Sequence, residues 1–138
     1  MKSILVDSGF LVALGIESDP RHHAARDFLH NYVGKLLVPE PVITETCFFL
    51  STAGKVRLLD WVRKLPRIVH YVPAHAYPDV GAILTRYADL DPDFTDAAIV
   101  WLAENTRCRS ILTVDVRDFS AFRLAKGRRF ELVKWFDR

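Results

Sequence analysis

The chain has 138 residues, half of them hydrophobic, which suits one domain with a substantial core and argues against disorder. No apolar run approaches a membrane span and the short N-terminal run is no signal peptide, so we expect a cytoplasmic protein with no membrane partner. The net charge is only +2, and Cys47 and Cys108 lack the paired spacing of a metal or disulfide motif.

The first predicted element is a buried strand, Ser3 to Val6, which ends at Asp7. Ser8 and Gly9 then turn the chain into a predicted helix over residues 10–16. Ligands of open α/β sheets bind beyond the carboxyl ends of the strands, so Asp7 is a candidate site residue. It is equally a candidate N-cap of the following helix, and Asp7 alone leaves both interpretations open.

Helices and short apolar strands alternate through the rest of the chain. Helices are expected over residues 20–33, 41–50, 55–65, 77–84 and 96–105, with a helical turn over 119–124. Strands are expected over residues 36–38, 68–72, 110–114 and 130–133. Thr95 is a predicted N-cap, and Val56, Leu58 or Leu59, and Val62 are predicted to face inward. This alternation predicts one α/β domain over residues 1–138 with a mostly parallel sheet.

Acidic residues occur where such a fold would gather them. Asp115 follows the strand over 110–114, and Asp96 lies in the first turn of a helix, where the dipole favours negative charge. Glu45 lies inside an apolar helix without Lys or Arg within one turn, and a buried unpaired carboxylate is costly. Carboxylates that share a pocket repel one another unless a cation binds, and oxygen ligands suit Mg²⁺ or Mn²⁺. Two such ions about 4 Å apart can drive phosphodiester hydrolysis.

Basic residues concentrate in two segments, 55–67 and 117–138. Such runs are either solvated helix faces or surfaces that contact phosphates. The candidates for RNA contact are Lys55, Arg57, Arg63, Lys64 and Arg117.

Five segments, in order along the chain, together resemble the PIN-domain ribonucleases, especially the small toxins of VapBC toxin–antitoxin pairs. They are Ile-Leu-Val-Asp7-Ser-Gly, Asp19-Pro-Arg-His22-His23-Ala-Ala, Val-Ile-Thr-Glu45, Phe-Thr-Asp96-Ala-Ala-Ile and Ile-Leu-Thr113-Val-Asp115-Val-Arg-Asp118-Phe. Each segment is moderately specific by itself, but their order and spacing extend the resemblance over essentially the whole chain.

The resemblance implies a single PIN-like domain with a five-stranded, mostly parallel sheet and helices on both faces. It implies catalytic, metal-binding roles for Asp7, Glu45, Asp96 and Asp115, with Asp118 and Asp93 as accessory acids. Ser8 and Thr113 would orient these acids or bound water, or else make only turn and strand-end hydrogen bonds. His22 and His23 are expected to be structural or surface residues.

The same resemblance implies an Mg²⁺- or Mn²⁺-dependent endoribonuclease, the toxin of a toxin–antitoxin pair. Its expected partners are the RNA substrate, an antitoxin and a second copy of the chain. The antitoxin is expected to bury the pocket, often with a basic side chain among the acids. Given this resemblance, contact with RNA phosphates becomes the favoured interpretation of the two basic segments.

Other interpretations remain open. A non-catalytic PIN-like module would bind RNA or a partner without cutting. A haloacid-dehalogenase phosphatase needs Asp-x-Asp after its first strand, where Gly9 stands here, and a receiver domain needs an acidic pair before its first turn. Scattered helix caps would explain most of the acids but not Glu45.

Overall fold

Five parallel strands form the central sheet of the computed structural model, which describes residues 2–137. Their order across the sheet is β3-β2-β1-β4-β5. Their bounds are β1 Ser3–Val6, β2 Lys35–Pro39, β3 Arg67–His70, β4 Ser110–Leu112 and β5 Glu131–Leu132. The predicted parallel five-stranded sheet is confirmed.

Strand β1 lies at the centre because both of its edges are paired. Leu5 aligns with Leu37 of β2 on one side and with Ile111 of β4 on the other. Leu5, Val6 and Ile111 are fully buried, as expected for a strand covered on both faces.

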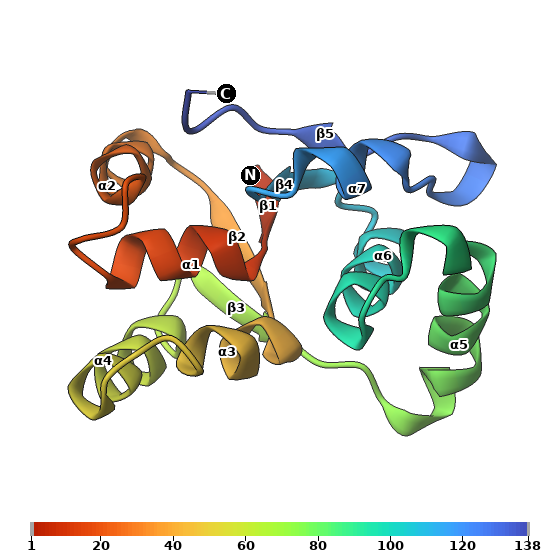
Figure 1. Ribbon diagram of the computed structural model, residues 1–138, viewed down its shortest axis with the longest axis horizontal. Helices are drawn as coiled ribbons and strands as arrows, with labels where there is room; N and C mark the ends of the chain where they lie inside the picture. The colour runs from red at the N-terminus through yellow and green to blue at the C-terminus, as the bar shows by residue number, and fades with distance from the viewer. Residues whose placement is uncertain (1, 138) are drawn as a thin grey trace.

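Helices cover both faces of this sheet, as expected. Their bounds are α1 Ser8–Gly15, α2 His22–Asn31, α3 Glu40–Cys47, α4 Thr52–Val62, α5 Tyr77–Arg86, α6 Phe94–Thr106 and α7 Val116–Ala121, with 3₁₀ turns η1 Ala74–Ala76, η2 Ala88–Leu90 and η3 Ala125–Gly127. In Figure 1, α1 to α4 lie to the left of the sheet and α5 to α7 to the right. Right-handed crossovers explain this division, because the chain first steps from β1 to β3 and then returns to β4 and β5.

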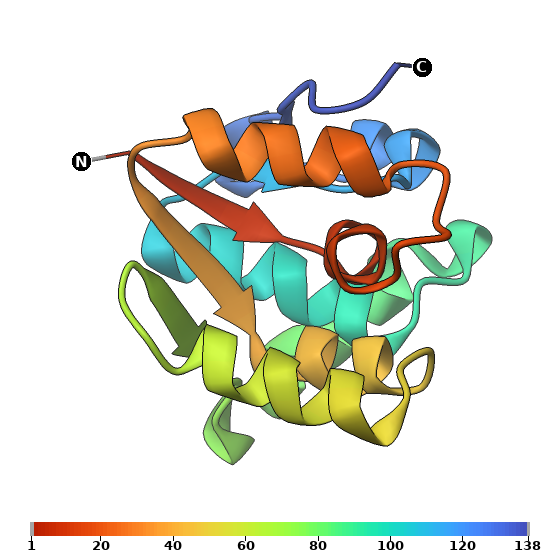
Figure 2. The same cartoon turned by 90° about the vertical axis from the view of Figure 1, so that its left-hand side faces the viewer.

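The direction of the strand order therefore reverses between β1 and β4. In open α/β sheets this switch point opens a crevice beyond the carboxyl ends of the strands. Figure 2 shows that α6 runs opposite to β1, so the N-terminus of α6 lies at the same end of the sheet as that crevice.

Several local predictions were wrong. Helix α6 begins at Phe94 with Asp93 as its N-cap, and Thr95, the expected cap, is buried in the first turn. The buried positions of α4 are Gly54, Leu58 and Val62, four residues apart, so Val56 lies on the outer face and is 62% exposed. Strand β4 ends at Leu112, two residues earlier than expected.

No helix in the range 2–137 has the length and apolar character needed to cross a membrane.

Candidate active site

Asp7 combines the two roles that its position in the sequence left open. Its backbone N–H donates to the carbonyl of Leu112, which continues the β1–β4 pairing to the strand ends. One carboxylate oxygen, Oδ1, accepts from the N–H of Ser8 at 2.8 Å and caps α1. The other, Oδ2, accepts from the hydroxyl of Thr113 at 2.7 Å. Asp7 is therefore an N-cap that also stands at the switch point of the sheet.

The surroundings of Asp7 disfavour its charged form. The side chain is only 7% exposed, and burial is the main cause that raises its pKa to about 6. The hydrogen bonds from Thr113 and Ser8 act in the opposite direction, while the nearby charges of Glu45 and Asp115 raise the pKa further. A neighbouring cation would stabilise the charged form of this buried carboxylate.

Glu45 finds its partner in Ser8. The Ser8 hydroxyl donates to Oε1 of Glu45 at 2.6 Å, across a separation of 37 residues. Because Ser8 follows Asp7 directly, this bond ties α3 to the end of β1 and brings the Glu45 carboxylate beside the Asp7 carboxylate. The expectation that Glu45 needs a polar partner is met by a hydroxyl rather than by a base.

Asp93 and Asp96 form a capping box at the start of α6. The N–H of Asp96 donates to Oδ1 of Asp93 at 2.8 Å, and the N–H of Asp93 donates to Oδ2 of Asp96 at 3.3 Å. The pKa of Asp96 is raised to about 7, first by burial and then by the charge of Asp93. The capping box therefore holds a second carboxyl group with a raised pKa.

Asp115 caps α7 and is connected to Asp7 through Thr113. The Asp115 N–H donates to Oγ1 of Thr113, and its own Oδ1 accepts from the N–H of Asp118. The hydroxyl of Thr113 thus links two candidate acids from neighbouring strand ends. Asp118 lies in the first turn of α7, whose N-cap is Asp115.

One pocket of 370 Å³ is lined by all four main candidate acids. Asp93 and Ser8 also line it, whereas Asp118 is not among its lining residues. The spacing of the sequence did not indicate that Asp19 and Arg21 would line it too; these residues were interpreted only as a helix start. Arg21 brings a cation, whose guanidinium carbon lies 4.7 Å from the centre of the Phe136 ring.

The donor set of this pocket fits a hard divalent cation. Mg²⁺ takes one or two carboxylates and keeps several waters or substrate oxygens, so it needs no complete protein cage. Over residues 2–137, no group of three or more His, Cys, Asp and Glu side chains is arranged to hold an ion by itself. Many of the carboxylate oxygens already accept hydrogen bonds from hydroxyls and amides.

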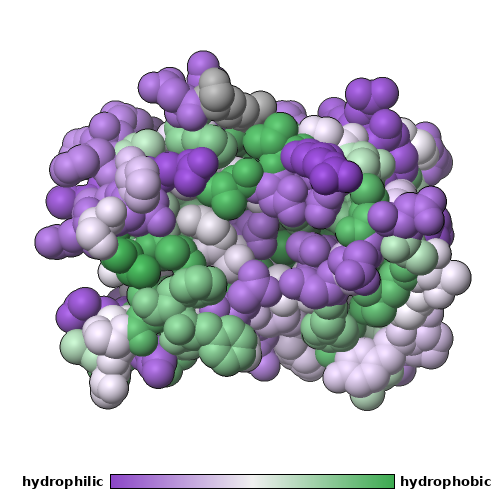
Figure 3. All heavy atoms as spheres, viewed as in Figure 1, coloured by the Kyte–Doolittle hydropathy of each residue, from purple (hydrophilic) through white to green (hydrophobic). Residues whose placement is uncertain are grey.

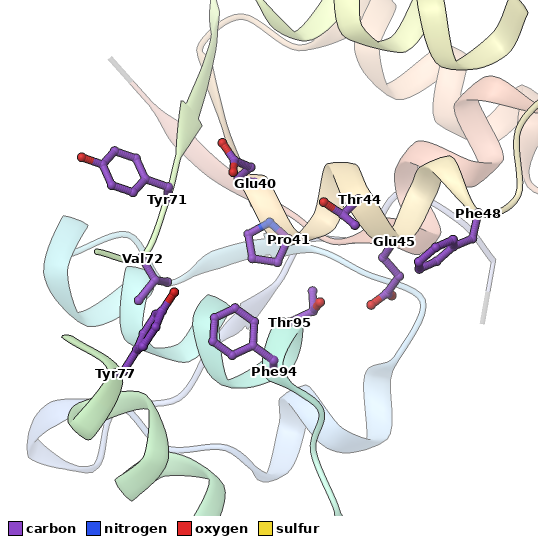
Figure 4. A pocket seen from close by; sticks show the side chains of 10 residues that line it. All are labelled: Glu40, Pro41, Thr44, Glu45, Phe48, Tyr71, Val72, Tyr77, Phe94 and Thr95. Atoms are coloured by element: carbon purple, nitrogen blue, oxygen red, sulfur yellow. The ribbon is translucent and has the colours of Figure 1, made fainter. Parts of the chain in front are cut away.

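A second pocket, shown in Figure 4, adjoins the acids through Glu45. It lies between α3 and the start of α6, with a volume of 380 Å³, and four of its ten lining residues are aromatic. Phe48 follows the end of α3 and is 80% exposed, which contradicts its expected place on the apolar face of a longer helix. In Figure 3, hydrophobic side chains gather over α1 and α3, beside a hydrophilic centre.

Three of the five candidate RNA-contacting residues lie on helices, and Arg63 and Lys64 directly follow the end of α4. Lys55 and Arg57 are exposed on α4, and Arg117 is exposed in the first turn of α7. Arg63 and Lys64 contact Asp60 at 3.0 and 3.1 Å, so part of their charge is already matched. His22 is structural, as expected, because its ring is buried and bonds to the carbonyl of Ala13.

The fold and the carboxylate pocket define an α/β protein with an acidic site at the switch point of its sheet. The family model of the PIN domain matches residues 4–127, and the chain therefore belongs to the PIN-domain family. The resemblance seen in the sequence is confirmed.

Two similar proteins have names that describe a ribonuclease and a toxin. The chain is 30% identical over 134 residues to ribonuclease VapC26 of Mycobacterium tuberculosis, a match that covers 94% of this chain and 99% of that protein. The crystal structure of VapC20 from the same species, a toxin that cleaves the sarcin–ricin loop, superposes with a TM-score of 0.78 over 86% of this chain and 94% of its own. At 21% identity, the likeness to VapC20 supports the fold alone.

Proposed function

We propose that the protein is a metal-dependent endoribonuclease and the toxin of a toxin–antitoxin pair. The observation that carries this proposal is the pocket into which β1, α3, α6 and the end of β4 bring Asp7, Glu45, Asp96 and Asp115. The kinship to ribonuclease VapC26 over nearly its whole length supports RNA as the substrate. We also expect the protein to act in the cytoplasm.

The proposed roles follow from the charges in the pocket. Asp7, Glu45, Asp96 and Asp115 would hold Mg²⁺ or Mn²⁺, which activates water and stabilises the leaving oxygen in phosphodiester hydrolysis. Ser8 and Thr113 would fix the orientation of the Glu45 and Asp7 carboxylates through the bonds they donate. Asp93 would hold Asp96 through the capping box, and Asp118 would support Asp115.

Arg21 adds a positive charge to the pocket wall. The face of Phe136 supports its guanidinium, so the side chain is held in place without an acidic partner. We propose that Arg21 contacts a phosphate of the substrate beside the cut bond, because a guanidinium suits two phosphate oxygens at once.

The decisive experiment is cleavage of total cellular RNA by the purified protein with Mg²⁺, with Mn²⁺ and with EDTA, beside an Asp96→Asn variant. We expect metal-dependent products that the variant does not yield, and the ends of these products would identify the sequence cut. Absence of cleavage with either metal, together with retained RNA binding, would favour the non-catalytic module instead.

For the antitoxin, the structure offers a groove of 920 Å³ between α1, α2 and α4. Leucines and Trp61 line it, together with four cations against two acids: Arg26, Arg57, Lys64 and Arg67 against Glu17 and Asp60. An acidic amphipathic helix would match both features. Arg57 and Lys64 are also candidates for RNA contact. Antitoxin binding and RNA binding are therefore both measured for an Arg57→Glu variant, and the kind of binding that is weakened assigns the role of Arg57.

For the expected homodimer, we propose the aromatic pocket of Figure 4 as the contact surface. Phe48, Tyr71, Tyr77 and Phe94 are exposed around it, and aromatic residues are enriched at the centres of interfaces. A Tyr77→Arg variant is then expected to elute and scatter light as a monomer under conditions where the unaltered protein is a dimer.

A further inference from the structure

A further pocket, lined by several cations, lies at the C-terminal end of α6, whereas the acids lie at its N-terminal end. It has a volume of 430 Å³, and Arg107, Arg109, Lys126 and Arg128 all line it. Glu104 is its single acidic lining residue. All four cations are exposed. Lys126 and Arg128 belong to the basic segment 117–138 that was favoured for phosphate contact, whereas Arg107 and Arg109 lie outside it.

Internal partners occupy several other cations of the chain. Among the four in this pocket, over the described part of the chain, only Arg109 donates from its side chain to an internal acceptor, the carbonyl of Arg129 at 3.4 Å. Arg123 donates to the carbonyls of Ser120, Ala121 and Phe122, at the C-terminus of α7. Arg67 stacks on Trp61. Within residues 2–137, the ion pairs of Lys and Arg are confined to Asp60, so none of the four cations is ion-paired with a carboxylate, and Glu104 offsets at most one of their charges.

The backbone holds this pocket in one shape. Arg123 and Arg129 pair as an antiparallel bridge, and the N–H of Leu124 donates to the carbonyl of Arg128 at 2.8 Å. The N–H of Glu131 donates to the carbonyl of Arg109, which anchors the hairpin to the start of β4. The four cations are thus presented by an ordered surface rather than by a loose tail.

Two of the four cations occupy strained backbone positions. Arg107 ends α6 with φ of 56°, and Lys126 has φ of 65° at the hairpin turn. Gly and Asn are the residues that favour this left-handed region. A basic side chain at both positions carries a backbone cost that its own packing does not explain, since both side chains are exposed.

We propose that this pocket is a secondary binding site for the phosphates of RNA, remote from the cut. From Asp96 to Arg107, α6 separates the two sites by about 17 Å at 1.5 Å per residue. An RNA that reaches both must be a folded or multi-nucleotide substrate, since a very short oligonucleotide fills only one. The proposal rests on RNA being the substrate, and it adds that the enzyme selects RNA large enough to engage both ends of α6.

The test is an Arg107→Asn, Lys126→Asn double variant. Asn tolerates both backbone positions, so the variant should keep or slightly raise the melting temperature while losing two charges. The matched control is Arg86→Gln with Lys35→Gln, which removes two exposed charges outside this pocket and outside both basic segments. Binding of a labelled RNA hairpin is measured in EDTA over a series of salt concentrations.

We expect the double variant to bind the hairpin about tenfold more weakly, with a salt slope flatter by about 0.7 per lost contact, and the control to bind normally. Hairpin cleavage should show a raised KM and an unchanged kcat, while cleavage of an RNA trinucleotide stays the same. Equal losses in variant and control, or an unchanged hairpin affinity, would overturn the site. Because binding is measured without metal, this result is independent of whether the acidic pocket cuts RNA.

Discussion

The hydroxyl of Thr113 donates a 2.7 Å hydrogen bond to Oδ2 of Asp7, across 106 positions of sequence. The same hydroxyl accepts from the N–H of Asp115 at 3.0 Å. One small side chain therefore positions two acids from neighbouring strand ends and favours the charged form of Asp7. Thr113 is a positioning residue whose effect is measurable through Asp7.

Thr113→Val removes the hydroxyl while keeping the shape of the side chain. The pKa of Asp7 should rise beyond its present value of about 6, because the bond from Thr113 favours the charged form. The acid limb of the pH–rate profile should therefore move to higher pH. The free energy of unfolding should fall by about 1–3 kcal/mol, since the N–H of Asp115 loses its acceptor. Thr113→Ser keeps the hydroxyl and should restore the profile; an unmoved acid limb in the valine variant would contradict the role.

The pH dependence of stability should report the crowding of the carboxyl groups. The pKa values of Asp7 and Asp96 are raised to about 6 and 7 from an ordinary 3.8. Between pH 4 and 7 the folded protein therefore binds more protons than the unfolded chain, and the free energy of unfolding falls as the pH rises through this window. For Asp7 the loss is at most about 3 kcal/mol, at 1.36 kcal/mol per pKa unit.

Asp7→Asn should abolish this contribution without breaking the fold. We expect the variant to melt at a higher temperature than the unaltered protein at pH 8 without metal, by a smaller margin at pH 5, and at a similar temperature below about pH 4. Added Mg²⁺ should raise the melting temperature of the unaltered protein at pH 8 and leave the variant nearly unchanged. If Asp7→Asn instead unfolds the protein, the N-cap role outweighs the electrostatic one.

Ser8→Ala removes the 2.6 Å bond to Glu45. Loss of a group that orients a metal-binding carboxylate typically costs tenfold to a hundredfold in metal affinity or activity. The rate of RNA cleavage should therefore saturate at a higher Mg²⁺ concentration. Ser8→Thr keeps the hydroxyl and serves as the control. A metal titration identical to that of the unaltered protein would mean that Glu45 needs no orientation from Ser8.

Gly9→Ala tests the close contact between α1 and the segment after β4. A Cβ at Gly9 would lie 2.5 Å from Cγ2 of Val114, so Val114 must move. We expect a loss of about 1–3 kcal/mol in the free energy of unfolding, as for other overpacked cores. Adding Val114→Ala removes the clashing methyl groups and should recover most of this loss. Strictly additive effects of the two substitutions would contradict a direct contact.

The sequence predicted the order of the elements and the positions of the acids better than it predicted the local caps. Buried apolar runs identified β1 and β2 within one residue, because both are covered on two faces. Thr95 was predicted as the cap of α6, but the cap is Asp93, which forms a capping box with the acid three residues later, Asp96. Helix periodicity alone could not decide between Leu58 and Leu59, which depends on where α4 meets its neighbours.

The contribution of Arg21 to the acidic pocket could not have been predicted from spacing. Its place depends on the turn between α1 and α2 and on Phe136, which comes from the far end of the chain. The basic pocket at the end of α6 is a similar case, because it joins a helix end to a hairpin formed later in the sequence. Contacts between distant segments of this kind leave no local pattern.

The place of β1 in the sheet has a consequence for biosynthesis. A ribosome makes this central strand about a hundred residues before its second neighbour, β4. Asp7 is therefore synthesised long before Thr113 and Asp115. A nascent chain released before β4 lacks part of the carboxylate pocket, so the activity proposed for this protein can emerge only after that strand and Asp115 have been made.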